Sequence, residues 1–376
     1  MQKLRLRVWL GGLLVAGGIC LGLWGQAAIP AQAKSSQAVT WYRQWKKAYV
    51  RGGQQKYVQT NDGHGASRVY SEGQGYGMLA SVLAAKRGVK THTTFNQLYR
   101  YYRAHRVSKA NPLMQWQQIK RQGKLTSVGS ERNSATDGDL DIAYALILAD
   151  KQWGSRKVNY RQAARQLLVA IQRSEINPTT HLPMMGNWAT TANDQRKLRT
   201  ADLMTGYFRA FAKVSQKAQW TRTANQSQKM VKKLSAQHKT GLFPDFTYVT
   251  GKHLTRRSVR PNTIESATDN QVGYNACRVP WRLAQTYRLT HDATTKRALT
   301  KQLNFFQRRS KVTAVYTLGG RAVYTYQNAA FTAPVVTAAR VLKRSTLQRK
   351  FAKQLPAKIQ KHDYYSATLQ MITAFA

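Results

Sequence analysis

Acidic residues are scarce in this chain, so an acid beside a glycine-rich turn is a candidate for chemistry. The 376 residues include 15 Asp and Glu against 60 Lys and Arg. The segment S-E-G-Q-G-Y-G-M, residues 71–78, places Glu72 where an expected loop turns into an apolar stretch. A carboxylic acid that an apolar setting keeps protonated can donate a proton to a leaving group. Glu72 is therefore a candidate general acid.

Glu72 also has a purely structural interpretation. Ser71 could cap the following helix, whose dipole favours a carboxylate in its first turn. That explanation does not account for Gly73, Gly75 and Gly77, since each glycine costs stability inside a helix. Glycines beside an acid indicate the close approach of a substrate or of another backbone. We therefore favour a functional role for Glu72.

A second group of acids lies in N-S-A-T-D-G-D-L-D-I-A-Y-A-L, residues 133–146. Thr136 or Asp137 could cap a helix here, with Asp139 and Asp141 in its first turn, although capping needs fewer than three acids. Asp-x-Asp-x-Asp also resembles the start of a calcium loop, but the glycine at its sixth position and the glutamate at its twelfth are missing. We expect no metal site.

The third acidic segment reads I-E-S-A-T-D-N-Q-V-G-Y-N-A-C-R, residues 264–278. Asp269 lies just before an expected helix, where capping is a sufficient reason for it. Glu265 lies four residues earlier, in an expected long loop, and no helical role accounts for it. Glu265 is thus a second candidate for chemistry.

Aromatic residues suggest what these acids act on. The chain has 9 Trp and 19 Tyr, and it lacks the G-x-S-x-G elbow of a serine hydrolase. Cleavage of a glycosidic bond needs one acid that protonates the leaving oxygen and a second carboxylate that activates water. Aromatic rings can stack on the sugar faces. The residue types therefore favour a glycosidase.

The net charge of +45 raises the question of a polyanionic partner. A nucleic-acid-binding protein can be this basic. The Lys and Arg are, however, spread along the whole chain, without a basic tail or an RNA-binding motif. We expect no specific nucleic acid partner, and we interpret the charge as suited to anionic cell-envelope polymers or to the surrounding medium.

The first 33 residues have the pattern of a secretory signal peptide. A basic start precedes an apolar run, residues 8–24, and an A-x-A site at 31–33 follows it. The alternative is an uncleaved anchor, because the run approaches the length of a membrane span. Glycines interrupt the run, so we expect cleavage after Ala33 and a secreted protein, residues 34–376, with a single domain.

The cysteines limit how this domain is stabilised. Only Cys277 remains once the signal peptide and its Cys20 are removed. A lone thiol forms neither an intramolecular disulfide nor a two-cysteine zinc site. Stability must therefore come from burial of a core.

Helical spacing of apolar residues recurs along the chain, whereas strand-like alternation is rare. The expected helices are 38–51, 72–88, 94–106, 137–152, 159–175, 200–216, 221–236, 271–289, 292–309, 328–342, 344–354 and 360–375. Twelve helices without a linker predict an all-α toroid of six inner and six outer helices, with an irregular bundle as the alternative. The expected long loops are 52–71, 107–136, 176–199, 237–270 and 310–327. A binding site is expected on such loops.

Three segments resemble conserved segments of glycoside hydrolase family 8, and the likeness covers essentially all of residues 34–376. They are S-E-G-Q-G-Y-G-M at 71–78, A-T-D-G-D-L-D-I-A-Y-A-L-I-L-A-D-K-Q-W at 135–153 and N-A-C-R-V-P-W-R at 275–282. The resemblance implies an (α/α)6 barrel, in agreement with the helix count. It also implies inverting hydrolysis of β-1,4-linked glucan or glucosamine chains in an open cleft, without a cofactor.

The resemblance further implies roles for individual residues. Glu72 matches the general acid, and Asp137 matches the carboxylate that holds the distorted sugar at the cleavage subsite. The other expected substrate contacts are Tyr76, Trp116, Trp188, Tyr274, Asn275 and Arg278.

Asn275 departs from most cellulose-cleaving members of that family, which have an aspartate there as general base. An amide cannot take a proton from water at neutral pH. A branch that includes chitosanases and lichenases resembles this chain in having the asparagine, and its base is a glutamate in the preceding loop. Glu265 matches that glutamate. We therefore expect Glu265 to be the base, roughly 6.5–9.5 Å from Glu72, and Asn275 to hydrogen-bond water or sugar.

Three hypotheses follow for the function. The leading one is a secreted, monomeric, endo-acting β-glucanase with a polysaccharide substrate. The second is a chitosanase, which we rank lower because a +45 protein repels polycationic chitosan. The third is a non-catalytic carbohydrate- or envelope-binding barrel, supported by Asn275 and opposed by the presence of Glu72 and Glu265.

Overall fold

The structure is a computed structural model that describes residues 36–61 and 65–376. The predicted signal peptide, residues 1–33, lies outside the described residues. Within them, no helix is both long enough and apolar enough to cross a membrane.

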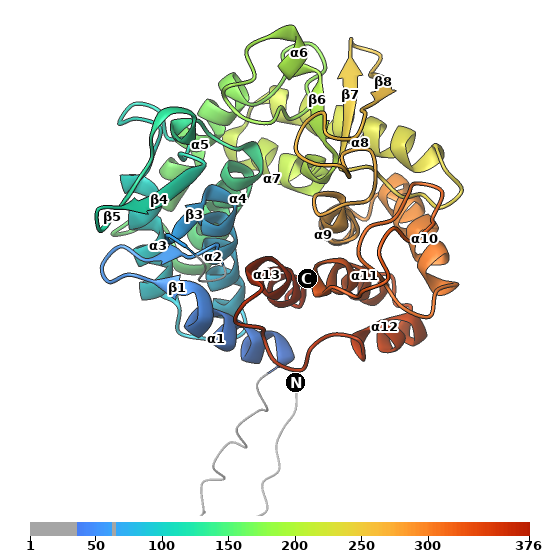
Figure 1. The fold of residues 1–376 in the computed structure, drawn as a ribbon. Helices are drawn as coiled ribbons and strands as arrows, with labels where there is room; N and C mark the ends of the chain where they lie inside the picture. The colour runs from blue at the N-terminus through green and yellow to red at the C-terminus, as the bar shows by residue number, and fades with distance from the viewer. Residues whose placement is uncertain (1–35, 62–64) are drawn as a thin grey trace, which may run out of the picture. The chain divides into compact units, whose positions relative to one another are not determined.

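Six helices pack side by side into an inner ring, which Figure 1 shows from one end. They are α2 (Ser71–Ala85), α4 (Thr136–Trp153), α7 (Thr205–Ser215), α9 (Val279–Thr290), α11 (Ala329–Val341) and α13 (Tyr364–Thr373). Each contacts the next in this order, and α13 contacts α2, so the ring closes. Both α2 and α4 are buried around nearly their whole circumference. A helix of that kind must be covered on all sides.

Six further helices surround the ring, each against an inner neighbour. They are α1 (Gln37–Tyr49), α3 (His92–Ala104), α5 (Tyr160–Ser174), α8 (Ala218–Ala236), α10 (Ala293–Gln307) and α12 (Ser345–Ala352). These helices are amphipathic: α5, for example, buries Leu167, Leu168 and Ile171 and exposes Arg and Gln on its other face. The predicted all-α (α/α)6 barrel is confirmed. All twelve expected helices are present, and α6 (Ala192–Gln195) adds a single turn within a loop.

The largest difference from the expected helix bounds is at the start of α9. The expected helix 271–289 starts only at Val279, after a short 3-10 turn, η3 (Ala276–Arg278). The Asp245 carboxylate accepts hydrogen bonds from the backbone amides of Gly273, Asn275 and Ala276. These bonds keep the preceding residues out of a regular helix, while Pro280 suits the first turn of α9.

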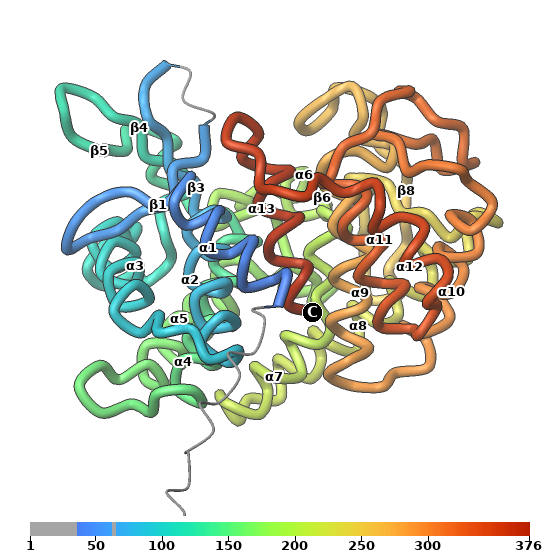
Figure 2. Tube along the Cα trace, turned by 90° about the horizontal axis from the view of Figure 1, so that it is seen from below, coloured from blue at the N-terminus to red at the C-terminus, as the bar shows by residue number. Residues whose placement is uncertain are grey.

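The described loops contain short strands that the sequence pattern did not predict. They are β1 (Val50–Arg51), β2 (Tyr57–Val58), β3 (Arg68–Tyr70), β4 (Gln117–Arg121), β5 (Lys124–Thr126), β6 (Lys197–Arg199), β7 (Phe246–Thr250) and β8 (Thr255–Ser258). They form the antiparallel sheets β1-β2, β3-β4-β5 and β6-β7-β8. Figure 2 shows β4 and β5 projecting beyond the helices on one side of the ring. Strands of two to five residues are too short for alternation to be recognised.

Candidate active site

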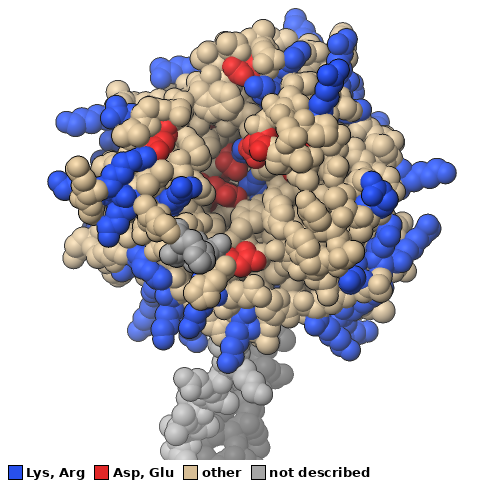
Figure 3. Space-filling model, in the orientation of Figure 1, with Lys and Arg blue, Asp and Glu red and all other residues tan. Residues whose placement is uncertain are grey.

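The face seen in Figure 3 is hollowed near its middle. Acidic and basic side chains gather in the hollow, whereas Lys and Arg dominate the outline of the molecule. Loops and the first turns of inner helices supply the charged residues there.

Glycines bring the first turns of α2 and α4 together. A Cβ added to Gly138 would lie 2.7 Å from the carbonyl carbon of Ser71 and 2.8 Å from the amide nitrogen of Glu72. A Cβ added to Gly75 would lie 3.0 Å from the carbonyl oxygen of Gly138. Of the three glycines of α2, Gly75 packs against another backbone, whereas a Cβ added to Gly73 or Gly77 would meet side chains, those of Thr60 and Tyr364 at Gly73 and that of Val58 at Gly77. The packing of α2 against α4 places Glu72 beside Asp137.

Helix capping does not explain these acids. The N-cap residues of α2 and α4 are Tyr70 and Ala135, and neither helix has a side-chain cap hydrogen bond. The expected caps from Ser71, Thr136 or Asp137 are thus wrong. Glu72 and Asp137 instead make contacts to distant parts of the chain.

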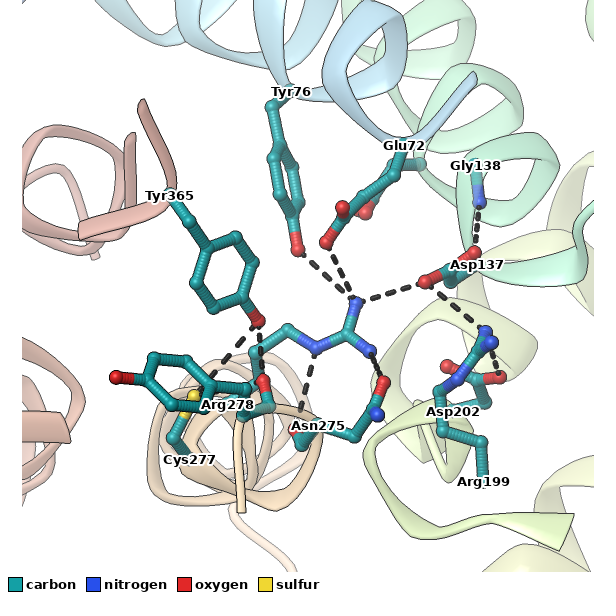
Figure 4. A network of polar contacts seen from close by, with 12 residues as sticks. Glu72, Tyr76, Asp137, Gly138, Arg199, Asp202, Asn275, Cys277, Arg278 and Tyr365 are labelled. Atoms are coloured by element: carbon teal, nitrogen blue, oxygen red, sulfur yellow. Dashed lines mark hydrogen bonds and ion pairs between the residues drawn. The ribbon is translucent and has the colours of Figure 1, made fainter. Parts of the chain in front are cut away.

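Arg278 is the centre of the site, as Figure 4 shows. Its Nη1 lies 3.0 Å from Oε1 of Glu72 and 2.9 Å from Oδ2 of Asp137. It also donates from Nη1 to the hydroxyl of Tyr76 at 3.3 Å and from Nη2 to Oδ1 of Asn275 at 2.9 Å. A planar guanidinium can hold several acceptors in fixed directions. Arg278 therefore orients both acids.

Asp137 is an ionised carboxylate between two arginines. Its Oδ2 also lies 3.1 Å from Nη1 of Arg199, and its Oδ1 accepts a hydrogen bond from the amide of Gly138. Burial pushes the pKa of Asp137 upward, but the guanidinium groups of Arg199 and Arg278 hold it well below its usual range.

Glu72 has the opposite electrostatic balance. Burial raises the pKa of Glu72, and the nearby Asp137 charge adds to that rise, while Arg278 only partly opposes it. The Glu72 side chain keeps 19% of its surface exposed. Glu72 thus combines a raised pKa with access from the hollow.

Glu265 is connected to Glu72 through a chain of hydrogen bonds that runs over Arg278 and Asn275. Asn275 donates from Nδ2 to Oε2 of Glu265 at 2.8 Å, while its Oδ1 faces Arg278. Glu265 Oε1 lies 3.0 Å from Nη2 of Arg199. The amide of Asn275 matches a donor on one side and a carboxylate on the other, which an aspartate could not do. The side chain of Asn275 thus contacts two protein groups, and its expected contact with water or sugar stays a prediction.

Two buried aspartates hold the loop that carries Glu265 and the turn that bears Asn275. Asp269 accepts hydrogen bonds from the backbone amides of residues 263–266, including that of Glu265 itself. The expectation that Asp269 caps the following helix is therefore wrong. Asp245 similarly holds the turn that bears Asn275, and burial raises the pKa of Asp245 to about 8.

The three acids at the start of α4 point to different partners. Asp139 accepts a hydrogen bond from the amide of Met114, so it holds a neighbouring loop. Asp141 instead pairs with Arg282 of α9, at 2.5 Å, and also accepts a hydrogen bond from Tyr207. No group of three or more His, Cys, Asp or Glu in the described part of the chain has the arrangement of a metal site.

The predicted substrate contacts divide into buried and exposed residues. Tyr76 and Arg278 are only 0% and 2% exposed, so their place is behind the acids, and their assignment as substrate contacts needs correction. Trp188 and Tyr274 are each 38% exposed. Trp116 is half-buried and stacks on Tyr70, with ring centroids 5.6 Å apart.

Arg199 and Asp202 belong to the network but were not predicted. Arg199 follows no motif and ends the three-residue strand β6, where pairing with β7 positions it. Asp202 is fully buried 3.4 Å from Arg199, and burial raises its pKa to about 7. Its only sequence signal is an acid within an apolar stretch.

The chain has relatives among known proteins. The chain is 33% identical over 315 residues to a protein named "Beta-glucanase" from Niallia circulans, an alignment covering 81% of this chain and 75% of that protein. It is 29% identical to an endoglucanase from Bacillus sp. strain KSM-330, covering 82% of this chain and 69% of that protein.

Solved structures with a similar fold include two glycoside hydrolases. The apo structure of a β-1,3-1,4-glucanase from Paenibacillus sp. X4 superposes with a TM-score of 0.82 at 31% identity, covering 90% of each chain. A cold-adapted family 8 xylanase shares the fold, with a TM-score of 0.74 at 18% identity, covering 91% of this chain and 90% of that one. The family model described as "Glycosyl hydrolases family 8" matches residues 21–376. The chain therefore belongs to family 8 of the glycosyl hydrolases.

Proposed function

We propose that this protein is an endo-acting glucanase that cleaves β-1,4-linked glucan of the cellulose or lichenan type with inversion of configuration. One observation carries the proposal. Arg278 and Asn275 connect two carboxyl groups through hydrogen bonds. One is Glu72, whose pKa is raised, and the other is Glu265, which is exposed. Inverting glycosidases need such a pair, with room between them for water.

In the proposed reaction, Glu72 donates its proton to the glycosidic oxygen as the bond from that oxygen to the anomeric carbon breaks. Glu265 accepts a proton from the water that attacks the same carbon from the opposite face, so the product anomer is inverted. Asp137 stays ionised and hydrogen-bonds the distorted sugar. The loop held by Asp269 sets the position of Glu265.

The substrate preference is supported by the names of the relatives, which are β-glucanases and endoglucanases. A chitosanase is the second candidate, because Asn275 and Glu265 match the branch that includes chitosanases. The charge of +45 disfavours polycationic chitosan, which the protein would repel at long range.

A substrate panel tests the proposal. Reducing ends released from lichenan, carboxymethylcellulose and chitosan are measured side by side, with the Glu72→Gln variant as background. We expect release from the glucans and an α-anomer as the first product seen by NMR. Activity on chitosan alone would reverse the order of the candidates, and glucan binding without hydrolysis above the Glu72→Gln background would favour a binding barrel.

We also propose that the protein is exported and that its outer surface binds anionic polymers of the cell envelope. Among the Asp and Glu of residues 36–61 and 65–376, Glu265 is the only one that is exposed. Within the same residues, the cations that pair with an acid are only Arg121, Arg161, Lys197, Arg199, Arg278 and Arg282. Among the described residues, the exposed charges are thus almost all cationic.

This second proposal has its own tests. The protein should be retained on alginate beads and not on uncharged dextran beads. Its retention on alginate should fall steeply as the salt concentration rises. Duplex DNA should compete without sequence preference. Protein recovered from the culture medium should start at Lys34 and run as a monomer in size-exclusion chromatography. Equal retention on both kinds of bead would refute the surface proposal without affecting the proposed catalysis.

A further inference from the structure

Exposed aromatic rings are concentrated near the candidate site. In the described part of the chain, the large aromatic side chains that are exposed are Trp188, Tyr274, Tyr324 and Tyr326. The two tyrosines of the 310–327 loop are the most open of the four, at 43% for Tyr324 and 49% for Tyr326. Apolar surface that is exposed and contiguous is typical of a ligand-binding site.

Tyr274, Tyr326 and Tyr324 form a continuous row. The hydroxyl groups of Tyr274 and Tyr326 lie 3.2 Å apart, and the rings of Tyr326 and Tyr324 stack with centroids 5.4 Å apart at an interplanar angle of 23°. Tyr274 directly precedes Asn275, which links Glu265 to Arg278. The row therefore begins one residue from Asn275 and continues to the exposed Tyr326 and Tyr324. We call these three side chains the tyrosine row.

The surrounding structure holds the ring of Tyr274 and the backbone that bears the other two rings. The ring of Tyr274 packs edge-on against Phe331 with centroids 5.1 Å apart. The backbone next to the other two rings is fixed, since Ala314 donates to the carbonyl of Tyr326 and Val323 donates to that of Val315, both at 2.9 Å. A ring that is already packed, as that of Tyr274 is, loses little entropy when a ligand binds.

The tyrosine row lies across the ring from the platform expected on the other side. The 310–327 loop connects α10 and α11, on the right in Figure 1, whereas Trp116 directly precedes β4, on the left. A polysaccharide that passes the acids would thus meet aromatic surfaces on both sides of the cleavage point.

We propose that the tyrosine row is an additional subsite for uncharged glucan, on the 310–327 side of the cleavage point. The apolar faces of the rings match the C–H faces of glucose, and the phenol hydroxyls can exchange hydrogen bonds with sugar hydroxyls. No charged group is needed for this recognition. The inference rests on the proposed glucanase function. It adds a surface that binds the part of a long substrate on the 310–327 side of the cleavage point.

The test compares the Tyr324→Ala/Tyr326→Ala variant with wild type on oligoglucans of increasing length. We expect kcat/KM to fall about tenfold on long chains, through KM, and to stay unchanged on the shortest chain cleaved. The Tyr324→Phe/Tyr326→Phe variant keeps the rings and should remain within about threefold of wild type. Tyr287→Ala, at the opposite end of α9 from Asn275, is the matched control and should change neither value. Circular dichroism and Tm establish that all variants fold.

A second measurement keeps the inference separate from catalysis. Affinity electrophoresis in gels containing lichenan reports binding even if the protein hydrolyses nothing. The absence of hydrolysis would refute the proposed function, but it would leave this binding test intact. The Ala variant should be retarded less than wild type and Tyr287→Ala equally. Equal retardation of wild type and the Ala variant, or equal kinetic losses on short and long chains, would overturn the subsite.

Discussion

Replacing Glu72 by glutamine separates a catalytic role from a structural one. Glutamine has nearly the same shape, and its oxygen can still accept the hydrogen bond that Glu72 receives from Nη1 of Arg278 at 3.0 Å. The variant therefore keeps the contacts of the site and loses only the proton. We expect it to fold and to bind glucan like wild type.

The expected loss of turnover follows from the role of Glu72. Removing a general acid lowers rates by about 10²–10⁴-fold, which corresponds to roughly 3–5.5 kcal/mol of barrier height. The stability should change in the opposite direction. Burial raises the pKa of Glu72, so the folded state loses stability when this group ionises, as pH rises through that pKa. Uncharged glutamine avoids the cost, so the Tm of the variant should equal or exceed that of wild type at neutral pH.

The assay measures kcat on lichenan and on a p-nitrophenyl oligoglucoside. The nitrophenolate leaving group needs no proton, so the loss on this substrate should be much smaller than on lichenan. The Asp150→Asn variant removes a carboxylate from the outside of the barrel, where Asp150 pairs with Arg161, and should keep full activity. Near-wild-type turnover of Glu72→Gln on lichenan, or equal losses on both substrates, would refute the assignment.

Three further predictions concern stability and metals. Asp141→Asn leaves Arg282, only 3% exposed, without its ion partner, and should lower the unfolding free energy by about 3–5 kcal/mol in denaturant titrations, against about 1 kcal/mol or less for Asp150→Asn. Burial raises the pKa of Glu175 to about 8, so its stabilising contribution is complete below the unfolded value near 4.5 and is lost as pH rises through 8. The Tm should therefore fall less steeply between pH 5 and 8 in Glu175→Gln than in wild type, and an unchanged slope would contradict the assignment. Activity should survive dialysis against EDTA, because the α4 acids bind arginines and backbone amides; a loss that calcium restores would contradict this.

The sequence predicted the helices because the 3.6-residue spacing of apolar positions is a local signal. It also predicted Glu72 and Asp137, which lie in distinctive segments. The strands were missed because they are only two to five residues long. Their contribution is considerable, since β6 carries Arg199 to the site.

Partners that are distant in the chain could not be predicted. Asp141 and Arg282 are 141 residues apart, and only the closure of the ring brings α4 near α9. Arg199 is one of 60 Lys and Arg, so nothing in the sequence distinguishes it. Asp269 has a plausible local role as a helix cap, but the loop folds back so that the carboxylate instead accepts the amides of residues 263–266.

The turnover of Glu265→Gln on lichenan tests the central claim most directly. Glutamine can keep the contact with Nη2 of Arg199, seen at 3.0 Å, but it cannot accept a proton from water. We predict at least a hundredfold loss of kcat, with glucan binding in gels preserved. Turnover equal to wild type would show that another group activates the water and would contradict the pairing of Glu72 with Glu265.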